Sequence, residues 1–287
     1  MPVSSLAEKT SLVSSSEYII LKTLLQFRDQ FEAVPQSFLA RQINFRPKEM
    51  QISLLKLIDL GLINYEKLGG EISYRINFSG LDTIAIKNLY IKNILKTLGE
   101  KIGEGKESVV YYGYDFNDNT LAIKFHRIGK SSYKKARILR GYTERKSWIT
   151  ITLDNAKREF DALKCIHDNS GYVPKPIATE YNAVVTEFIE GTLLNNYELK
   201  DPNKALNSIL GTLRIAYNYC GKMIHGDLSP YNILVDNDEN VYIIDWPQWK
   251  VDDHVLLNRD LQNILYYFSK KYNIESDFDK IMKYIRG

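Results

Sequence analysis

The stretch Met223-Ile-His-Gly-Asp-Leu-Ser-Pro-Tyr-Asn-Ile-Leu-Val235 decides the fold, together with Ile243-Ile-Asp-Trp246, which follows it after a polar turn. An Asp stands five residues before an Asn, and a second Asp ends the next apolar run, which is the spacing of a phosphoryl-transfer site. Asp227 can orient or accept the proton of an attacking hydroxyl, while Asn232 and Asp245 offer the hard oxygen ligands that Mg²⁺ prefers beside ATP phosphates. The plainer alternative is a polar turn between two buried strands.

Composition sets the broad class of the protein. Of the 287 residues, 44% are apolar, which is enough for two or three domains with their own cores. Cys165 and Cys220 fall in amphipathic helical patterns, so we expect small core side chains rather than a disulfide or a metal site. The sequence has no membrane-length apolar run and no signal-peptide layout, which predicts a cytoplasmic chain without a membrane partner. The net charge of +3 is too small to indicate nucleic-acid binding by itself.

Residues 1–80 predict three helices followed by a hairpin. Helical periodicity covers 14–31 and 36–43, and Pro47 opens a third helix. Two short strand patterns then flank Gly69-Gly70, a tight-turn signal. This order is that of a winged helix that contacts RNA, although many winged helices bind only proteins. The polar side chains expected on the nucleic-acid face are Arg46, Lys48, Gln51, Lys56 and Lys67.

A connecting helix over 81–98 leads to a phosphate-binding pattern, Lys101-Ile-Gly-Glu-Gly-Lys-Glu-Ser-Val-Val-Tyr111. The glycine pattern alone is weak, but the strand Leu121-Ala-Ile-Lys124 follows it, as in the glycine-rich loop and Lys strand of protein kinases. In this interpretation the loop amides approach phosphate oxygens and Lys124 neutralises the α and β phosphates. The expected ATP-binding residues of the loop are Gly103, Gly105, Lys106, Glu107, Ser108 and Val110.

Two further elements complete the predicted nucleotide site. The helix Asp154 to Asp168 should supply the acidic partner of Lys124, and we favour Glu159 over Asp161 because Glu has the longer reach. A buried strand pattern over 183–190 ends at Gly191 and predicts a hinge, where backbone groups of Glu187 and Ile189 would meet the adenine.

Residues 127–148 form a basic segment that we expect to be a mobile, solvated loop. Its cations predict RNA contact, and its serines predict self-phosphorylation. The RNA candidates are Lys130, Lys134, Lys135 and Arg137. The phosphorylation candidates are Ser131, Ser132 and Ser147.

Taken together, these motifs resemble the RIO family of atypical serine/threonine kinases, in the subfamily with an N-terminal winged helix. The resemblance implies an α+β fold: a winged helix at 1–80, the connecting helix at 81–98, an N-lobe at 99–190 and a truncated C-lobe at 191–287. It also implies a cytoplasmic serine kinase and ATPase, archaeal or eukaryotic, that uses ATP with Mg²⁺ or Mn²⁺. The implied partner is the RNA of the pre-ribosomal small subunit, the implied state is a monomer, and a transient phosphoaspartate on Asp245 is favoured.

The sequence departs from conventional kinases where the RIO family does. Gly226 replaces the Arg that holds a phosphorylated activation loop, and Asp-Trp-Pro replaces Asp-Phe-Gly. No Ala-Pro-Glu element follows Asp245, so we expect transfer to water or to the protein itself rather than to generic peptides. Two alternatives stay open: a small-molecule kinase of the aminoglycoside or choline type, which shares His-Gly-Asp, and an RNA-binding scaffold that uses nucleotide only as a switch.

Overall fold

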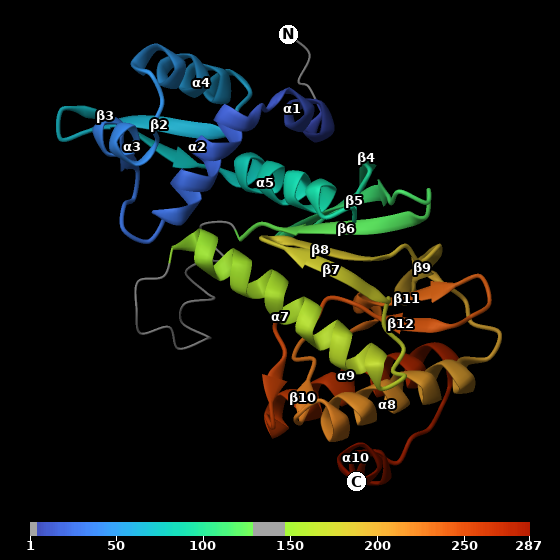
Figure 1. Cartoon of the computed structure of the whole chain (residues 1–287). Coiled ribbons are helices and arrows are strands. Elements are labelled where there is room, and N and C mark those ends of the chain that lie inside the picture. Colours follow the sequence, from blue (N-terminus) through green and yellow to red (C-terminus); the bar gives the residue numbers. More distant parts are fainter. Residues whose placement is uncertain (1–4, 129–146) are drawn as a thin grey trace. The chain divides into compact units, whose positions relative to one another are not determined.

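The computed structural model describes residues 5–128 and 147–287 (Figure 1), and its chain divides into two compact units. The first unit comprises Met1–Ala156 and Thr179–Ala183, and the second comprises Lys157–Ala178 and Val184–Gly287. The division therefore passes through one long helix and through one hairpin. No helix in the described part of the chain is long and apolar enough to cross a bilayer.

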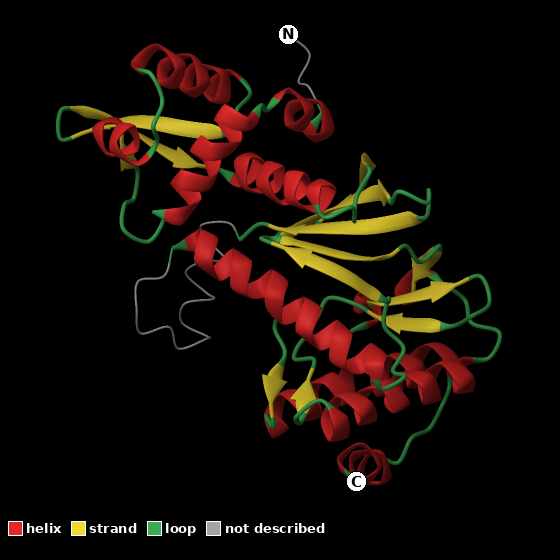
Figure 2. Cartoon of the chain, viewed as in Figure 1, coloured by secondary structure: helices red, strands yellow, loops and turns green. Residues whose placement is uncertain are grey.

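The first unit begins with helices around a small antiparallel sheet (Figure 2). Strands β1 and β2 both pair with β3, giving the order β1-β3-β2. The side chains of Leu21, Leu39 and Leu57 are fully buried in the core between the helices and the sheet. The elements are α1 (Leu6–Leu12), α2 (Ser15–Gln26), β1 (Val34–Pro35), α3 (Gln36–Gln42), α4 (Pro47–Asp59), β2 (Ile63–Leu68) and β3 (Glu71–Ile76).

A buried carboxylate joins α2 to α4. Glu17 accepts a hydrogen bond from the backbone N–H of Ser14 in a capping box, and Lys56 Nζ lies 3.0 Å from its Oε2. Burial raises the pKa of Glu17, but the hydrogen bonds from Ser14 and Lys56 outweigh burial and lower the pKa to about 2. Lys56, which was predicted to face outward, provides the counter-charge that this buried carboxylate requires, while its side chain stays 39% exposed.

Helix α5 (Phe78–Ile91) is shorter than the connecting helix predicted over 81–98. It ends where Asn93 takes a left-handed backbone conformation (φ 57°), and residues from Thr97 onward form strand β4. Leu95 and Leu98 are buried, so the apolar pattern continued past the true end of the helix. Periodicity alone did not separate the last turn of the helix from the beginning of the strand.

A five-stranded sheet with the order β4-β5-β6-β8-β7 follows α5. One face is apolar, because Leu121, Ile123 and Phe125 alternate along β6 and are all buried. Its strands are β4 (Thr97–Glu104), β5 (Ser108–Tyr114), β6 (Thr120–His126), β7 (Pro176–Glu180) and β8 (Ala183–Glu187).

A buried polar network anchors the end of β6. Asp82 of α5 is fully buried and accepts hydrogen bonds from the Arg127 guanidinium and, at 2.7 Å, from Asn182 Nδ2. The Asn182 side-chain amide also donates to the backbone carbonyl of His126, and the backbone carbonyl of Asn182 accepts from the His126 N–H. Burial raises the pKa of Asp82 to about 6, although Arg127 and Asn182 both favour the charged form. The network connects α5, the end of β6 and the β7–β8 turn.

The second unit is mainly helical, with two small antiparallel sheets, β12-β11-β9 and β10-β13. Helix α8 is amphipathic and buries Leu206, Ile209 and Leu213 along one face. The elements are the part of α7 (Trp148–Asp168) from Lys157 onward, β9 (Gly191–Leu193), α8 (Pro202–Tyr219), β10 (Met223–Ile224), β11 (Ile233–Asp236), β12 (Val241–Ile243), β13 (Lys250–Val251), α9 (His254–Tyr272) and α10 (Phe278–Arg286).

Cys165 and Cys220 form a disulfide, with their Cα atoms 5.9 Å apart. The expectation that they are separate core side chains was therefore wrong. Helical periodicity places each cysteine on the inward face of its own helix, but it does not show that the ends of α7 and α8 approach one another. The bond joins segments that are 55 residues apart in sequence.

Candidate active site

The loop that carries Asp227 lies between β10 and a 3₁₀ turn, Pro230–Asn232. Gly226 has a φ of +82°, and a Cβ at this position would lie 3.2 Å from the carbonyl oxygen of Gln248. Both the backbone conformation and the space therefore favour glycine at this position. Leu228, on the other side of Asp227, is fully buried and anchors the loop in the core.

Helix α9 holds this loop through a buried carboxylate. Asp260 Oδ2 accepts the N–H of Gly226 at 2.6 Å, and Oδ1 accepts the N–H of Leu228 at 3.1 Å. Burial raises the pKa of Asp260, although the hydrogen bonds from the two N–H groups favour its ionised form. Asn263 donates to the Leu228 carbonyl, and Arg259 donates to the Gly226 carbonyl. The backbone on both sides of Asp227 is thus fixed by one face of one helix.

The hydrogen bonds of His225 define its tautomer. The backbone N–H of Asp227 donates to Nδ1 at 3.2 Å, so Nδ1 is an acceptor and the ring proton is on Nε2. Nε2 then donates to the Ile244 carbonyl at 2.9 Å. The ring is fully buried and lies 4.6 Å from the Trp246 ring. His225 therefore joins the Asp227 loop to the segment that carries Asp245, and it acts here as a structural residue.

Asn232 and Asp245 are brought together by the β11–β12 ladder. Ile233 pairs with Ile243, and the ladder continues as the Ile244 N–H donates to the Asn232 carbonyl at 2.9 Å. Asp245 follows at once, in a left-handed conformation (φ 68°) that is uncommon for a residue other than glycine. The Asn232 amide group donates to the Asp227 carbonyl, which leaves Oδ1 as the atom that can ligate a cation.

These two side chains fit a Mg²⁺ ion that shares its coordination sphere with phosphates. Carboxylate and amide oxygens are ligands that Mg²⁺ accepts. No cluster of three or more His, Cys, Asp or Glu residues that could hold a metal occurs within residues 5–128 and 147–287. Asn232 and Asp245 would hold the cation, which would supply charge neutralisation beside the phosphates.

In the first unit, the predicted phosphate-binding residues form one row across three strands. Gly103 pairs with Val110, and Val110 pairs with Lys124. Lys124 is half-buried on the face opposite to Ile123 and Phe125. No atom lies within 4 Å of a Cβ built on Gly103, and at Gly105 the nearest atom is 3.8 Å away. The space beside the backbone at both glycines is therefore open to a group that approaches the loop. The Glu107 carbonyl accepts the N–H of Arg127 at 2.7 Å, which fixes the base of the loop, while Lys106 at the turn is exposed.

The remaining predicted nucleotide contacts lie in the second unit. Glu159 of α7 is buried, whereas Asp161 is exposed and pairs with Lys157 on the same helix at 2.8 Å. Asp161 thus faces solvent, which favours Glu159 as the acidic residue of the site. At the hinge, the Glu187 carbonyl accepts the Thr186 hydroxyl at 3.0 Å, and Ile189 follows the end of β8.

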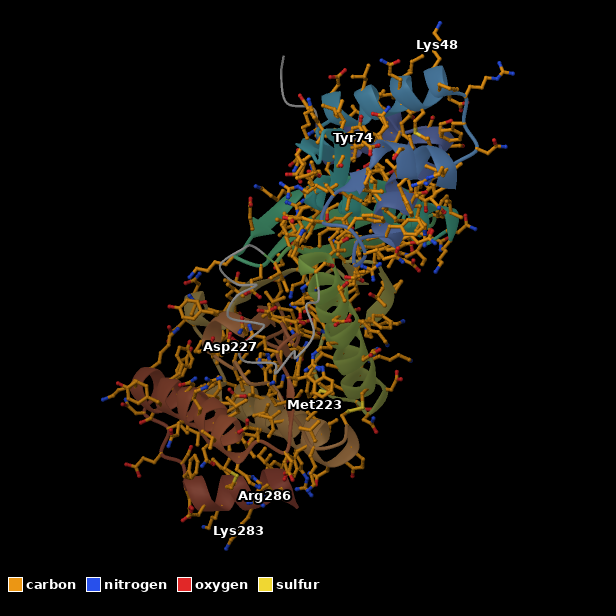
Figure 3. All side chains as sticks on the ribbon, turned by 90° about the vertical axis from the view of Figure 1, so that its left-hand side faces the viewer. Lys48, Tyr74, Met223, Asp227, Lys283 and Arg286 are labelled. Carbon is orange, nitrogen blue, oxygen red and sulfur yellow. A yellow bond between two sulfur atoms is a disulfide. The ribbon has the colours of Figure 1, made fainter. Side chains whose placement is uncertain are left out.

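The predicted RNA-contact residues are only partly described. Arg46, Lys48 and Lys67 are exposed, and Lys48 projects from α4 into solvent (Figure 3). Lys130, Lys134, Lys135, Arg137, Ser131 and Ser132 lie outside the described residues. Ser147 is described: its hydroxyl accepts the N–H of Thr150 at 3.2 Å, at the beginning of α7.

Sequence reasoning missed Arg259, Asp260 and Asn263, which position the Asp227 loop. A signal was present, since Asp260 is an acidic residue on the apolar face of an otherwise amphipathic helix. A buried carboxylate must have partners, and backbone N–H groups of a tight loop are the usual ones.

Comparisons with known proteins identify the relatives of this chain. The family model described as RIO domain matches residues 109–281. A RIO-type serine/threonine-protein kinase Rio2 from Methanocaldococcus jannaschii is 32% identical, and the match covers 88% of this chain and 98% of the relative. The serine/threonine-protein kinase RIO2 of Caenorhabditis elegans is 29% identical, and there the match covers 87% of this chain but only 49% of the relative.

Two solved structures share the fold. The Rio2 kinase of Chaetomium thermophilum, in a complex with ADP, Mg²⁺ and phosphoaspartate, has a TM-score of 0.80 at 22% identity, over 98% of this chain and 89% of that chain. A second structure of that kinase has a TM-score of 0.78 at 24% identity. The kinase-like α+β fold is thus confirmed, and the matching sequence relatives confirm the resemblance that the motifs gave. The chain belongs to the RIO family of serine/threonine-protein kinases, among its Rio2 members.

Proposed function

We propose that this kinase binds ATP with Mg²⁺ and acts as an ATPase and self-phosphorylating switch. The observation that carries the proposal is the adjacency of Asn232 and Asp245, enforced by the Ile244–Asn232 hydrogen bond, beside a loop on which α9 fixes Asp227. Lys124, Gly103 and Val110, aligned in one row, would bind the phosphates. Glu159 is the residue we assign to orient Lys124, and Glu187 and Ile189 would contact the adenine through their backbone.

Each side chain has a defined task in this proposal. Asp227 orients an attacking water or serine hydroxyl and accepts its proton, and Asp260 keeps Asp227 in place through the loop backbone. Asn232 and Asp245 would hold Mg²⁺, or Mn²⁺ in its place, which supplies charge neutralisation between the phosphates. Because phosphoryl transfer depends mostly on positioning and electrostatics, the rigid attachment of the loop to α9 is the main contribution of the fold.

We further propose that Asp245 accepts the phosphoryl group transiently. A carboxylate oxygen of Asp245 would attack the γ-phosphorus, the bond to the β–γ bridging oxygen would break, and ADP would leave. Water would then hydrolyse the acyl phosphate and release inorganic phosphate. The phosphoaspartate in the Chaetomium relative supports this assignment, as does the uncommon backbone conformation of Asp245.

The stability of the label tests this assignment. After incubation with labelled ATP and Mg²⁺, treatment with hydroxylamine should remove the label if it is an acyl phosphate. Label that survives and maps to Ser131, Ser132 or Ser147 would show that only the serines react. An Asp245→Asn variant should carry no hydroxylamine-sensitive label, whereas a Ser147→Ala variant should keep it.

The physiological setting belongs to the same proposal. We propose a cytoplasmic monomer acting in small-subunit maturation, with a winged helix at residues 1–80 and a short C-lobe. Only residues 246–253 separate Asp245 from α9, which leaves no room for a long activation segment. Exposed Arg46, Lys48 and Lys67 support RNA contact.

A second candidate partner for the N-terminal helices is another protein. Ile52 and Leu55 are 56% and 53% exposed in the middle of the outward face of α4. Two adjacent exposed aliphatic side chains favour protein contact over phosphate contact. RNA contact and protein contact can be told apart by measuring the binding of ribosomal RNA. The wild type is compared with an Arg46→Glu, Lys48→Glu variant and with an Ile52→Ser, Leu55→Ser variant. RNA binding lost only in the first variant supports the RNA assignment.

A further inference from the structure

A groove of about 620 Å³ lies between the end of the Asp227 loop and helix α9, in the second unit. Ser229 and Pro230 form one side, and two successive turns of α9 form the other. Its volume is within the range of ordinary ligand sites. Nothing in the proposed chemistry at Asp227, Asn232 and Asp245 uses this groove. Its lining residues are Ser229, Pro230, Asn263, Tyr266, Tyr267, Lys270 and Lys271.

The groove is rigidly connected to the reacting group. Asp260 and Asn263 hold the backbone of Gly226 and Leu228, and the same helix continues one turn later as the groove wall. Pro230 also begins the 3₁₀ turn that leads to Asn232. The groove begins two residues after Asp227 in the chain, so a segment bound there would be held at a fixed position relative to the Asp227 loop, which is what an acceptor hydroxyl requires.

Part of the lining has a structural role. Lys271 Nζ donates to the Tyr197 carbonyl at 2.5 Å and pairs with Glu198 at 3.2 Å. The Tyr267 hydroxyl donates to the Leu194 carbonyl at 2.7 Å. These contacts fix the floor of the groove and neutralise the charge of Lys271.

Lys270 and Tyr266 are different, because both are exposed. Tyr266 is 66% exposed, and Lys270 Nζ lies 5.6 Å from its ring centre. No carboxylate in the described part of the chain lies within 4 Å of Lys270 Nζ, and none of the lining residues is acidic. Among the described residues, the groove therefore presents one positive charge without a carboxylate partner, next to an aromatic ring and a proline.

We infer that this groove is an acceptor-docking subsite for an acidic protein segment, in which a carboxylate pairs with Lys270 while an apolar side chain packs on Tyr266 and Pro230. The inference rests on the proposed kinase activity. A nucleic acid fits less well, because it is held by many phosphate contacts and the described lining of the groove offers only Lys270 as a cation without a carboxylate partner. A basic segment would be repelled by Lys270.

Peptide binding to the full chain tests this inference without any turnover. Two fluorescein-labelled nonapeptides serve as probes: one has a central serine between pairs of aspartate, and the other has lysine in place of each aspartate. Measured by anisotropy without nucleotide, the acidic peptide should bind about fivefold more tightly than the basic one, the size expected for an exposed charge pair. Lys270→Glu should reverse this order, and Tyr266→Ala should weaken both peptides.

Lys283→Glu is the matched control, since Lys283 points to solvent from α10 and the charge change is the same (Figure 3). Equal binding of the two peptides, or an equal effect of Lys283→Glu and Lys270→Glu, would overturn the inference. A ten-nucleotide single-stranded RNA that loses affinity in Lys270→Glu while the peptides do not would assign the groove to nucleic acid instead. ATP affinity, measured separately by calorimetry, reports on the proposed function. Failure of the groove inference can therefore be distinguished from failure of the proposed function.

Discussion

At the scale of single residues, Lys124 and Asp227 should differ in what they contribute. Lys124 lies in the row with Val110 and Gly103 that we assign to the phosphates, whereas Asp227 acts on the attacking oxygen. Lys124→Ala should weaken ATP·Mg²⁺ binding about tenfold or more, and Asp227→Ala should change it by less than about twofold while abolishing steady-state ATP turnover. Titration calorimetry measures both affinities.

Lys96→Ala is the control for loss of a lysine, because Lys96 is exposed and pairs with Asp118 at 2.7 Å. Its ATP affinity should equal that of the wild type. Equal ATP affinity in wild type and Lys124→Ala would contradict the assignment of Lys124.

Glu17 gives a prediction about stability and pH. Its pKa in the folded protein is about 2, compared with 4.5 in an unperturbed Glu. A lowered folded pKa stabilises the fold fully above the unfolded value, and the contribution is lost as the pH falls from about 4.5 toward 2. Glu17→Gln should therefore lower the free energy of unfolding by about 3 kcal/mol at pH 7, and by less at pH 3.

Urea unfolding at the two pH values measures this difference. Glu8→Gln is the matched control, since Glu8 occupies the same capping-box position in α1 but is exposed there. A loss in Glu17→Gln that is no larger than in Glu8→Gln, or that is unchanged at pH 3, would contradict the prediction.

Residue positions that depend on short sequence spacing could be predicted from the sequence. Asp227, Asn232 and Asp245 lie within one loop and one hairpin, so their spacing alone brings Asn232 and Asp245 together. The Lys56–Glu17 pair could not be predicted, because the two residues are 39 positions apart and Glu17 is buried only after α2 and α4 pack together.

At the scale of secondary-structure elements, α9 has two roles that its sequence pattern does not reveal. Its buried face holds the Asp227 loop, and its exposed face lines the groove. Periodicity predicted the helix. It could not predict which backbone groups the buried Asp260 contacts, because these contacts depend on the tertiary fold. The same limit explains the error in α5, where buried residues of a strand continued the pattern of a helix.

Asp260→Asn should reduce phosphoryl transfer and leave ATP affinity nearly unchanged. An amide has one acceptor oxygen and presents an NH₂ group to the other backbone N–H, so one of the two loop contacts is lost. A hydrogen bond to a charged group contributes about 1.5 to 3 kcal/mol, which corresponds to a fall in kcat of roughly tenfold to a hundredfold.

Single-turnover transfer and ATP titration measure the two effects separately. Asp279→Asn, on α10, is a control for loss of a carboxylate elsewhere in the same unit. A parallel loss of ATP affinity in Asp260→Asn would show a general collapse of the site instead of a displaced loop.

At the scale of the whole molecule, the disulfide should stabilise only the second unit. Cys165 and Cys220 both belong to that unit and close a loop of 55 residues. Closing a loop of that length is expected to contribute about 2 to 4 kcal/mol. Reduction should therefore lower the melting temperature of the second unit and leave that of the first unit unchanged.

Calorimetry with and without reductant measures this effect, and a Cys165→Ser, Cys220→Ser variant should not respond to reductant. A shift in both transitions, or in neither, would contradict the prediction. The sequence predicted α2, α3, α4 and the β2–β3 hairpin in their order, since periodicity and turn signals are local, but it missed α1 and β1. It did not predict the disulfide or the division of the chain, because both depend on contacts between distant segments.

The turn Thr179–Ala183 has a consequence for how such proteins can be recombined. It belongs to the first unit although both of its flanks belong to the second, and Asn88 and Lys92 of α5 bind its Glu180. The chain therefore passes from one unit to the other three times, after residues 156, 178 and 183. If only the continuous N-terminal segment were exchanged between two relatives, the turn would still come from the protein that supplies the second unit. A functional chimera must therefore carry the hairpin tip across together with the helices, as one grafted set of interleaved segments.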